Sequence, residues 1–415
     1  MTTLLRVCTA GSVDDGKSTL IGRLLFDAKA LMSDQLTQVE EASRRRGFAR
    51  TELALVTDGL RAEREQGITI DVAWRYFSVP GRRFILADTP GHVQYTRNMV
   101  TGASTAEAAL LLVDARQGLT EQSRRHLYLT TLLGVRHLVV AINKMDQVDF
   151  SFERFAEIRE IIDAYLRQRT RGAASVVYVP VSALHGDNVV TRSDRTAFYQ
   201  GPTLLEHLTQ LDTVRDQAHA PFRLPVQWIV RPQTDAHHDY RGIAGRIAAG
   251  TVRVGDAITV HPSGKSTTVR ALETSGGPVQ EARRGASVTL HLEHDVDVSR
   301  GDVLAAAAAP PRIGQDLVAD LAWFSPRPAE AGKRYLLKHT TRTTKATLAS
   351  IEHVVDVASG AALSKRDVEE NDIARVAFKT AAPLVWEPYE TDRILGSALL
   401  VDETTHETLG GLMLR

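Results

Sequence analysis

The feature that most constrains the fold of this chain is a glycine loop, GSVDDGKST at residues 11–19. It follows the apolar stretch LLRVCTA, which predicts a strand, and it precedes TLIGRLLF, which has the spacing of a helix. Glycines at both ends of such a loop let backbone N–H groups turn inward around an anion, and the helix N-terminus adds its positive dipole. The pattern therefore predicts a phosphate-binding turn in an α/β domain.

The side chains of this loop indicate how a nucleotide would be held. We predict that Lys17 neutralises the β- and γ-phosphates and that the Ser18 hydroxyl binds Mg²⁺. Two carboxylates stand in the middle of the loop, but backbone N–H groups hold the phosphates, so intervening side chains are free to point away. The predicted nucleotide-binding residues of the loop are Gly11, Ser12, Val13, Asp14, Asp15, Gly16, Lys17, Ser18 and Thr19.

Short apolar runs recur through the first half of the chain, at 4–10, 83–88, 108–115, 137–143 and 175–182. They are continuous rather than alternating, as expected for parallel strands covered on both faces. Helical patterns separate several of them, which predicts a doubly wound, mostly parallel α/β domain over 1–215. An insertion at about 27–66 is rich in arginine. We interpret it as a solvated helix pair, and a docking surface for a partner is the alternative.

The pattern of the sequence changes after the proline-bounded junction HAPFRLP. Short apolar runs separated by Gly, Pro, Asp and Ser are typical of small antiparallel barrels. We predict one β-barrel over 222–308 and a second over 313–415, with a linker at 305–316. The Gly-Lys-Ser of PSGKST at 262–267 lies in this barrel texture and is interpreted as a hairpin turn, not as a second phosphate loop.

Two further motifs suit the γ-phosphate. FILADTPGH places Asp88 at the end of an apolar strand, where it can reach the Mg²⁺ shell through water, and Gly91 three residues later can meet the γ-phosphate. In GITI, Thr69 can bind both Mg²⁺ and the γ-phosphate, so the segment before it should order with the triphosphate. The predicted metal ligands are Ser18, Thr69 and Asp88.

The motif NKMD at 143–146 follows another strand and predicts guanine recognition. A carboxylate at Asp146 can accept from N1 and N2 of guanine, whereas adenine offers no such donor pair. Asn143 would bond the base or tie loops together, and the stem of Lys144 would cover the ring. Because these motifs all end predicted parallel strands, we expect them to meet at one edge of the sheet. The next strand end should offer a backbone N–H to guanine O6, from Ser182, Ala183 and Leu184.

Composition limits the partners of the chain. Lys plus Arg and Asp plus Glu both number 50, so no overall field favours nucleic acid or an anionic membrane. No apolar run approaches the roughly 18–20 residues of a membrane helix. The single cysteine, Cys8, cannot form an internal disulfide, which suits a reducing cytosol. We therefore expect a cytoplasmic protein without a nucleic-acid or membrane partner.

Taken together, GSVDDGKST, GITI, DTPGH, NKMD and SAL followed by two barrels resemble the translation-factor-type GTPases. Over essentially the whole chain, the sequence resembles more specifically the GTPase subunits of bacterial sulfate adenylyltransferase. The stretches GSVDDGKSTLIGRLLFD and LRAEREQGITIDVAWRYF carry this resemblance. Asp15 and Gln66 favour it, since translation factors usually have histidine and arginine at these places.

The resemblance implies a GTPase that pairs with a separate, ATP-using catalytic subunit, in a heterodimer or a higher oligomer of it. GTP hydrolysis would drive the formation of adenylyl sulfate and diphosphate from ATP and sulfate, the first step of sulfate assimilation. The alternative is an elongation-factor-like GTPase that binds aminoacyl-tRNA, against which balanced charge, Asp15 and the long insertion weigh.

The resemblance also assigns roles to particular residues. His92 would position the attacking water, and Val13 and Ile68 would form an apolar gate that holds it back. A monovalent cation would lie near Asp14. The expected ligands are thus GTP, Mg²⁺ and that cation, and the catalytic residues are His92, Lys17 and Thr69.

Overall fold

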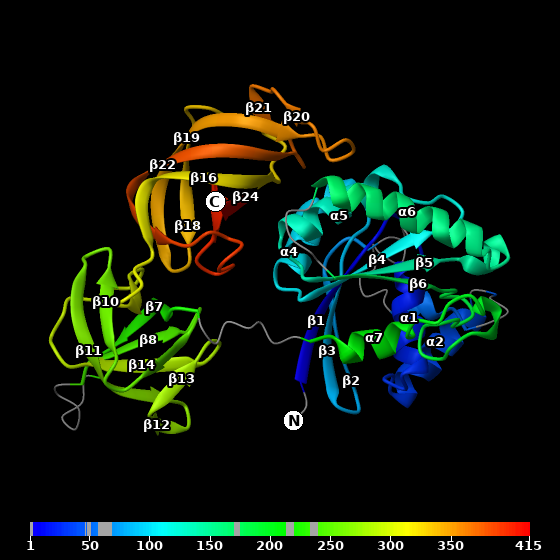
Figure 1. The fold of residues 1–415 in the computed structure, drawn as a ribbon, viewed down its shortest axis with the longest axis horizontal. Helices are drawn as coiled ribbons and strands as arrows, with labels where there is room; N and C mark the ends of the chain where they lie inside the picture. The colour runs from blue at the N-terminus through cyan, green and yellow to red at the C-terminus, as the bar shows by residue number, and fades with distance from the viewer. Residues whose placement is uncertain are drawn as a thin grey trace. The chain divides into compact units, whose positions relative to one another are not determined.

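The computed structural model describes residues 3–45, 47, 51–56, 69–169, 175–212, 220–232 and 240–415. It divides into two compact units, one of Met1–Thr213 with Val357–Gly360 and one of Val214–Asp356 with Ala361–Arg415 (Figure 1). In the described part of the chain, no helix has the length and apolar character needed to cross a membrane.

The first unit contains a six-stranded sheet in the order β2-β3-β1-β4-β5-β6. Its five predicted strands are confirmed, and all of them run parallel. The sixth, β2, pairs antiparallel with β3 at one edge. Every residue of β4 is buried, which explains why its sequence is apolar without alternation. The bounds are β1 (Thr3–Ala10), β2 (Ala73–Val79), β3 (Arg82–Asp88), β4 (Ala108–Asp114), β5 (His137–Asn143) and β6 (Ser175–Pro180).

Helices cover both faces of this sheet. The first and last α-helices of the unit share one core cluster with the strands, while α5 and α6 lie on the other face (Figure 1). On α6, the apolar residues spaced three or four apart from Phe155 to Tyr165 are buried, but Phe152 is exposed at the helix start. The bounds are α1 (Lys17–Asp27), α2 (Ser33–Arg45), α4 (Thr96–Ser104), α5 (Glu121–Leu132), α6 (Phe152–Arg169) and α7 (Leu204–Gln210), with 3-10 helices at Leu53–Val56, Val93–Tyr95, Met145–Val148 and Asp194–Thr196.

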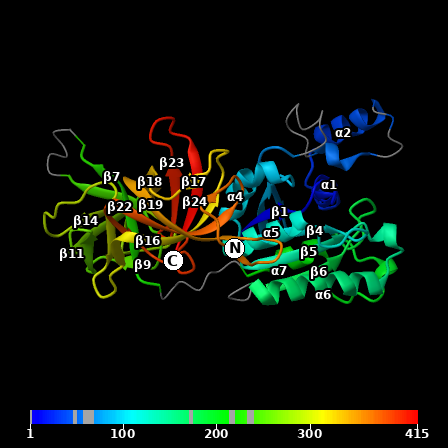
Figure 2. The ribbon, with the colours of Figure 1, turned by 90° about the horizontal axis from the view of Figure 1, so that it is seen from above.

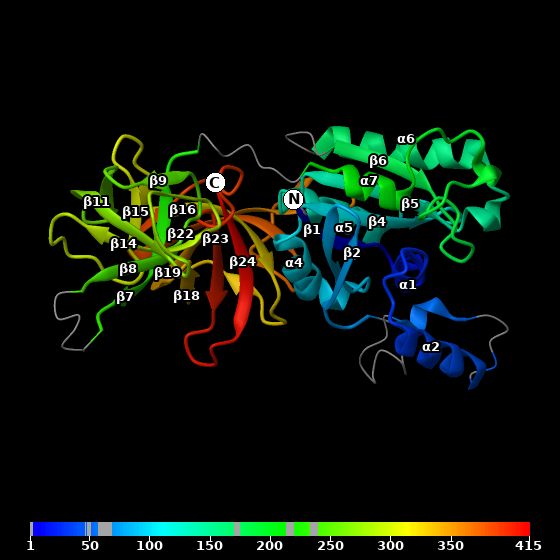
Figure 3. The same cartoon turned by 90° about the horizontal axis from the view of Figure 1, so that it is seen from below.

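Only part of the insertion, which we predicted as a solvated helix pair, lies in the described ranges. It has one described α-helix, α2, which lies beside α1 in both Figure 2 and Figure 3. The short helix Leu53–Val56 packs on α1 so closely that a Cβ at Gly22 would lie 2.0 Å from the Leu53 carbonyl oxygen. Arg44 and Arg45 are exposed and pair with glutamates one turn earlier. The described helix α2 is mostly exposed, as predicted, and the helix pair stays a prediction because residues 57–68 lie outside the described ranges.

The second unit consists of two antiparallel barrels, each closed by a pairing between its end strands. The first has the order β10-β15-β7-β8-β14-β11 and closes through β10–β11, and the second has the order β18-β23-β24-β16-β22-β19 and closes through β18–β19. The first barrel comprises β7 (Arg223–Val230), β8 (Gly242–Arg246), β10 (Ala257–His261), β11 (Lys265–Thr274), β14 (Ser287–Leu292) and β15 (Val303–Ala306), with β9 (Thr251–Arg253), β12 (Gly277–Val279) and β13 (Glu281–Arg283) beside it. The second comprises β16 (Arg312–Trp323), β18 (Arg334–His339), β19 (Arg342–Val355), β22 (Ile373–Trp386), β23 (Ser397–Val401) and β24 (Thr408–Leu414), with β17 (Ala329–Glu330), β20 (Ala362–Leu363) and β21 (Asp367–Val368) beside it.

The predicted linker at 305–316 is wrong at both ends. Strand β15 continues to Ala306, and β16 begins at Arg312, so the connection is shorter than predicted. Small alanine side chains resemble linker composition, but Ala305 is buried in the wall of the first barrel. The Gly-Lys-Ser at 264–266 lies at the turn between β10 and β11, as the barrel texture predicts.

Candidate nucleotide-binding site

The predicted site residues lie at the carboxyl ends of neighbouring parallel strands. Strand β1 lies between β3 and β4, and β4, β5 and β6 follow in register. The glycine loop therefore comes after β1, Asp88 ends β3, Asn143 ends β5, and Ser182 follows β6. In doubly wound sheets this edge is where ligands bind.

The glycine loop contains three residues with positive φ, which bend its backbone sharply. Gly11, Asp14 and Gly16 have φ values of 145°, 67° and 94°, and Gly16 is the N-cap of α1. The buried Lys17 reaches back over the loop, where its Nζ donates to the Gly11 carbonyl at 2.9 Å and the Ser12 carbonyl at 2.8 Å. Burial lowers the pKa of Lys17. The cation of Lys17 therefore lies over the glycine loop at the N-terminus of α1, the end of a helix that favours an anion.

The two carboxylates of the loop have different environments. Asp14 is exposed, whereas Asp15 is 2% exposed and its Oδ2 accepts the Ser12 N–H at 2.6 Å. Burial raises the pKa of Asp15 to about 6, and the charge of Lys17 opposes that rise. The buried Asp15 side chain thus accepts a hydrogen bond from the backbone of its own loop.

Asn143 joins the glycine loop to the loop after β6. Its Nδ2 donates to the Asp15 carbonyl at 2.7 Å, and its Oδ1 accepts the Ala183 N–H at 2.9 Å. A Cβ at Gly16 would lie 2.5 Å from that Nδ2, so the contact needs glycine there. The sequence predicts that Asn143 either bonds the base or ties loops together, and this geometry corresponds to the second role.

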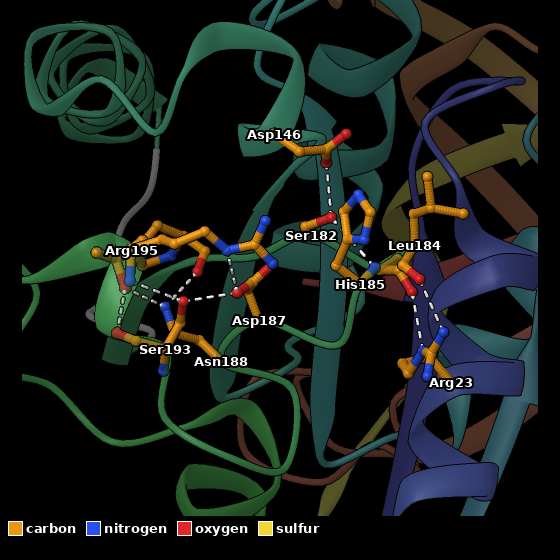
Figure 4. A network of polar contacts seen from close by, with 12 residues as sticks. Arg23, Asp146, Ser182, Leu184, His185, Asp187, Asn188, Ser193 and Arg195 are labelled. Carbon is orange, nitrogen blue, oxygen red and sulfur yellow. Dashed lines mark hydrogen bonds and ion pairs between the residues drawn. The ribbon is translucent and has the colours of Figure 1, made fainter.

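The remaining NKMD side chains are also held in place. Lys144 Nζ donates to the Asp14 carbonyl and lies 3.0 Å from Asp114 Oδ2. Ser182 Oγ donates to Asp146 Oδ1 at 2.6 Å, as Figure 4 shows, and Gln147 Nε2 donates to Oδ2 at 2.8 Å. Although burial opposes it, these two hydrogen bonds lower the pKa of Asp146. A carboxylate has about four acceptor positions, so Asp146 can still accept donors from a base.

The residues predicted near the γ-phosphate are less closely connected. Asp88 is buried and accepts the Thr9 hydroxyl at 3.1 Å, and Gly91 packs so closely that a Cβ there would lie 2.4 Å from Lys17 Nζ. His92 is half-buried, and its Nδ1 accepts the Gln94 N–H at 3.3 Å. Three other predicted residues, Ser18, Thr69 and Val13, are half-buried, and Ile68 and Gln66 lie outside the described residues.

Sequence reasoning missed a set of residues that support the glycine loop. The Gly11 N–H donates to Nδ1 of His126 at 3.0 Å, and Ser12 Oγ lies 2.8 Å from the Thr120 hydroxyl at the N-cap of α5. His126 is almost fully buried; burial and the charge of Lys17 lower its pKa to about 3. Asp114 was also missed, although its place at the end of an apolar strand could have identified it.

Three protein families match the chain. The elongation factor Tu GTP-binding domain matches residues 2–214, elongation factor Tu domain 2 matches 243–305, and the eEF1A C-terminal domain-like family matches 316–413. The Ski7 GTPase-like domain of S. cerevisiae, solved with GDP and inorganic phosphate, is 17% identical with a TM-score of 0.55. That comparison covers 100% of this chain and 97% of Ski7, and it shows the shared fold alone.

Several curated relatives match along the whole chain. A bifunctional CysN/CysC enzyme of Mycobacterium tuberculosis is 50% identical over 100% of this chain and 68% of its own length. Sulfate adenylyltransferase subunit 1 of Bacteroides fragilis is 47% identical over 98% of this chain and 84% of its own length. The same subunit of Vibrio vulnificus is 45% identical over 99% of this chain and 86% of its own length. The chain therefore belongs to the elongation factor Tu-type GTPases and, among them, to the sulfate adenylyltransferase subunit 1 family.

Proposed function

We propose that this chain binds and hydrolyses GTP, and that the hydrolysis drives formation of adenylyl sulfate and diphosphate from ATP and sulfate on a separate catalytic subunit. The observation that carries the nucleotide site is the Asn143 amide, which bonds the glycine loop and the loop after β6 at the same time. The names of the relatives, subunit 1 of sulfate adenylyltransferase, support the reaction and a partner subunit.

Charge stabilisation is the main task of the phosphate side of this site. The transferred phosphoryl group spreads negative charge over its oxygens, so catalysis depends on positioned cations and N–H groups. Lys17 is already held over the loop by two backbone carbonyls, which fixes its charge where the β- and γ-phosphates would lie. Gly91 lets Lys17 approach this closely, because a Cβ there would lie 2.4 Å from Nζ.

The base side would recognise guanine. Asp146 is oriented by Ser182 and Gln147, and its lowered pKa keeps it ionised so that it can accept N1–H and N2–H of guanine. Because the Ala183 N–H already donates to Asn143, the backbone N–H of Leu184 would meet O6. Lys144, held between Asp114 and the Asp14 carbonyl, would cover one face of the ring.

The oxygen donors near the γ-phosphate fit Mg²⁺. Hydroxyls of Ser18 and Thr69 and the buried carboxylate of Asp88 are hard ligands, and Mg²⁺ commonly takes few protein ligands and completes its shell with phosphates and water. Among the described residues, no three His, Cys, Asp or Glu side chains gather into a protein-only metal site. When bound, Mg²⁺ would neutralise charge on the phosphates.

His92 would place the attacking water. Its Nδ1 accepts a backbone N–H, so the neutral ring carries its proton on Nε2, and that nitrogen remains to hold the water. The exposed Asp14 carboxylate at the rim of the loop is the group that would hold a monovalent cation.

Two measurements test the proposal. Calorimetry with Mg²⁺ should show that the purified chain binds GTP much more tightly than ATP, and lack of preference would refute the base assignment. The chain combined with an ATP-using subunit should make adenylyl sulfate faster with GTP than with a non-hydrolysable analogue. Equal rates would refute the energetic coupling, and salt-dependent aminoacyl-tRNA binding would instead support a translational GTPase.

A further inference from the structure

We infer that Arg23, on the helix that follows the glycine loop, is a positioning residue for guanine recognition. The inference rests on the proposed GTP site and deepens it. Figure 4 shows the Arg23 guanidinium facing the backbone at Leu184, on the same loop whose Ser182 holds Asp146. Arg23 acts through that backbone and is not placed in contact with the nucleotide.

Arg23 holds two consecutive carbonyls of the loop. Its Nε donates to the Ala183 carbonyl at 3.2 Å, and its Nη2 donates to the Leu184 carbonyl at 2.7 Å. Nη1 lies 3.4 Å from Asp27 Oδ1, one turn later on α1. Because the guanidinium is a rigid planar fork, fixing it at Asp27 orients the donors that reach the loop.

These bonds fix the direction of an N–H group proposed to meet guanine O6. In a trans peptide, the carbonyl of one residue and the N–H of the next point to opposite sides. Holding the Ala183 carbonyl toward α1 therefore turns the Leu184 N–H away from α1. The preceding peptide is fixed separately, since the Ala183 N–H donates to Asn143. Arg23 thus sets the orientation of the peptide between Ala183 and Leu184, which Asn143 does not hold.

The backbone of the loop is shaped for this close approach. Gly186 has a φ of 87°, and a Cβ there would lie 3.0 Å from Asp27 Oδ2 and 3.4 Å from Arg23 Cδ. Arg23 follows Lys17 by about 9 Å along the same helix, at 1.5 Å per residue. One rigid element therefore carries both the phosphate-binding lysine and the arginine that orients the base-binding loop.

The far side of the loop is anchored independently of Arg23. Asp187 accepts from Ser193 Oγ at 2.6 Å and pairs with Arg195 (Figure 4). In addition, Asn188 Nδ2 donates to the Pro180 carbonyl at 2.8 Å. Loss of Arg23 should therefore free the peptide between residues 183 and 184 without unfolding the loop.

The test compares GTP with a nucleotide that lacks O6 and, in consequence, the proton on N1. Dissociation constants of the full chain for GTP and for 2-aminopurine riboside triphosphate, which lacks O6, are measured by calorimetry for wild type and Arg23→Ala. We expect Arg23→Ala to weaken GTP binding about tenfold, or about 1.4 kcal/mol, and to change binding of the analogue less than about twofold. Arg192→Ala is the matched control, because Arg192 also donates to a backbone carbonyl, that of Gly201, and should change neither constant.

Each outcome decides one proposition. Equal losses for GTP and the analogue, or no loss for GTP, would overturn the positioning role. A wild type that binds GTP no better than ATP would instead refute the proposed function, whatever Arg23 does. Should Arg23→Ala lower the melting temperature, Arg23→Lys serves in its place. A lysine cannot hold two carbonyls as a fork, so it should show the same selective loss, and full GTP affinity would overturn the inference.

Discussion

His126 offers a direct test of how the glycine loop is supported from below. Its Nδ1 accepts the Gly11 N–H at 3.0 Å, and its Nε2 lies 3.0 Å from the Gln122 amide. His126→Leu removes the acceptor, so the N–H of Gly11 loses its partner, which should lower the free energy of unfolding by about 1–3 kcal/mol. His126→Asn keeps an acceptor near the position of Nδ1 and should lose much less at pH 7.

The free energies of unfolding of the wild type and of His126→Asn should diverge at acid pH. The pKa of His126 is about 3 in the folded chain, because burial and Lys17 disfavour the charged ring, and about 6.5 when unfolded. Above pH 6.5 both states are neutral and the native stability is complete. Below it only the unfolded state takes a proton, so stability falls by about 1.4 kcal/mol per pH unit toward pH 3. At pH 5 the wild type should carry a penalty of about 2 kcal/mol that His126→Asn lacks.

Asp15, a second buried group in the loop, has the opposite effect on how stability depends on pH. The pH dependence of the wild type alone therefore does not isolate the contribution of His126. The pKa of Asp15 is raised to about 6 by burial, which means that the folded chain holds its proton more firmly than the unfolded chain. Stability from Asp15 is therefore gained as pH falls from about 6 toward 4. Because both proteins retain Asp15, its contribution cancels when wild type and His126→Asn are compared at each pH.

The assay is urea unfolding followed by helical circular dichroism. All α-helices of the described residues lie between Lys17 and Gln210, so this signal reports the first unit and not the barrels. The refuting result is a stability difference between wild type and His126→Asn that stays constant from pH 7 to pH 5. That outcome would show that His126 does not remain neutral in the folded chain.

Three further substitutions test the site itself. Asp146→Asn should weaken GTP binding on the order of 100-fold, because charged hydrogen bonds worth about 3 kcal/mol are lost, and it should favour xanthine nucleotides. Competition binding measures this preference, and an unchanged preference would count against the role of Asp146. His92→Ala should keep GTP affinity and lower turnover about 100-fold or more in single-turnover hydrolysis, whereas unchanged turnover contradicts its role. Gly16→Ala should lower the free energy of unfolding by at least about 1–2 kcal/mol, because φ is 94° and the new Cβ meets Asn143; urea unfolding measures this, and an unaltered midpoint would be evidence against that contact.

The parts that sequence predicted well share one physical cause. Strands buried on both faces must be continuously apolar, so β1, β3, β4 and β5 stand out in the sequence within a residue or two. Because the carboxyl ends of parallel strands meet at one edge, motifs far apart in the sequence could be assigned to one place from their strand-end positions alone.

The parts that sequence missed depend on contacts between distant residues. His126 is an ordinary helix residue until the fold brings it to Gly11, 115 positions earlier, and Arg23 meets carbonyls about 160 positions away. Every residue has a backbone carbonyl, so the residue types of the loop do not show which carbonyls accept a side-chain donor. The contacts of Arg23 could therefore not be predicted from sequence spacing. The packing of the insertion on Gly22 was missed for the same reason, since it depends on a tertiary contact.

The two carboxylates in the phosphate loop are compatible with a polyanion because the fold separates them from it in different ways. Asp14, in a left-handed conformation, presents its side chain to solvent at the rim. Asp15 is buried and accepts the Ser12 N–H, and Lys17 and Lys144 both oppose the rise in its pKa. Asp15 therefore restrains the start of the loop in the same way that His126 does one residue earlier. Both act on backbone N–H groups and not on the side chain of Lys17, which we propose to meet the phosphates.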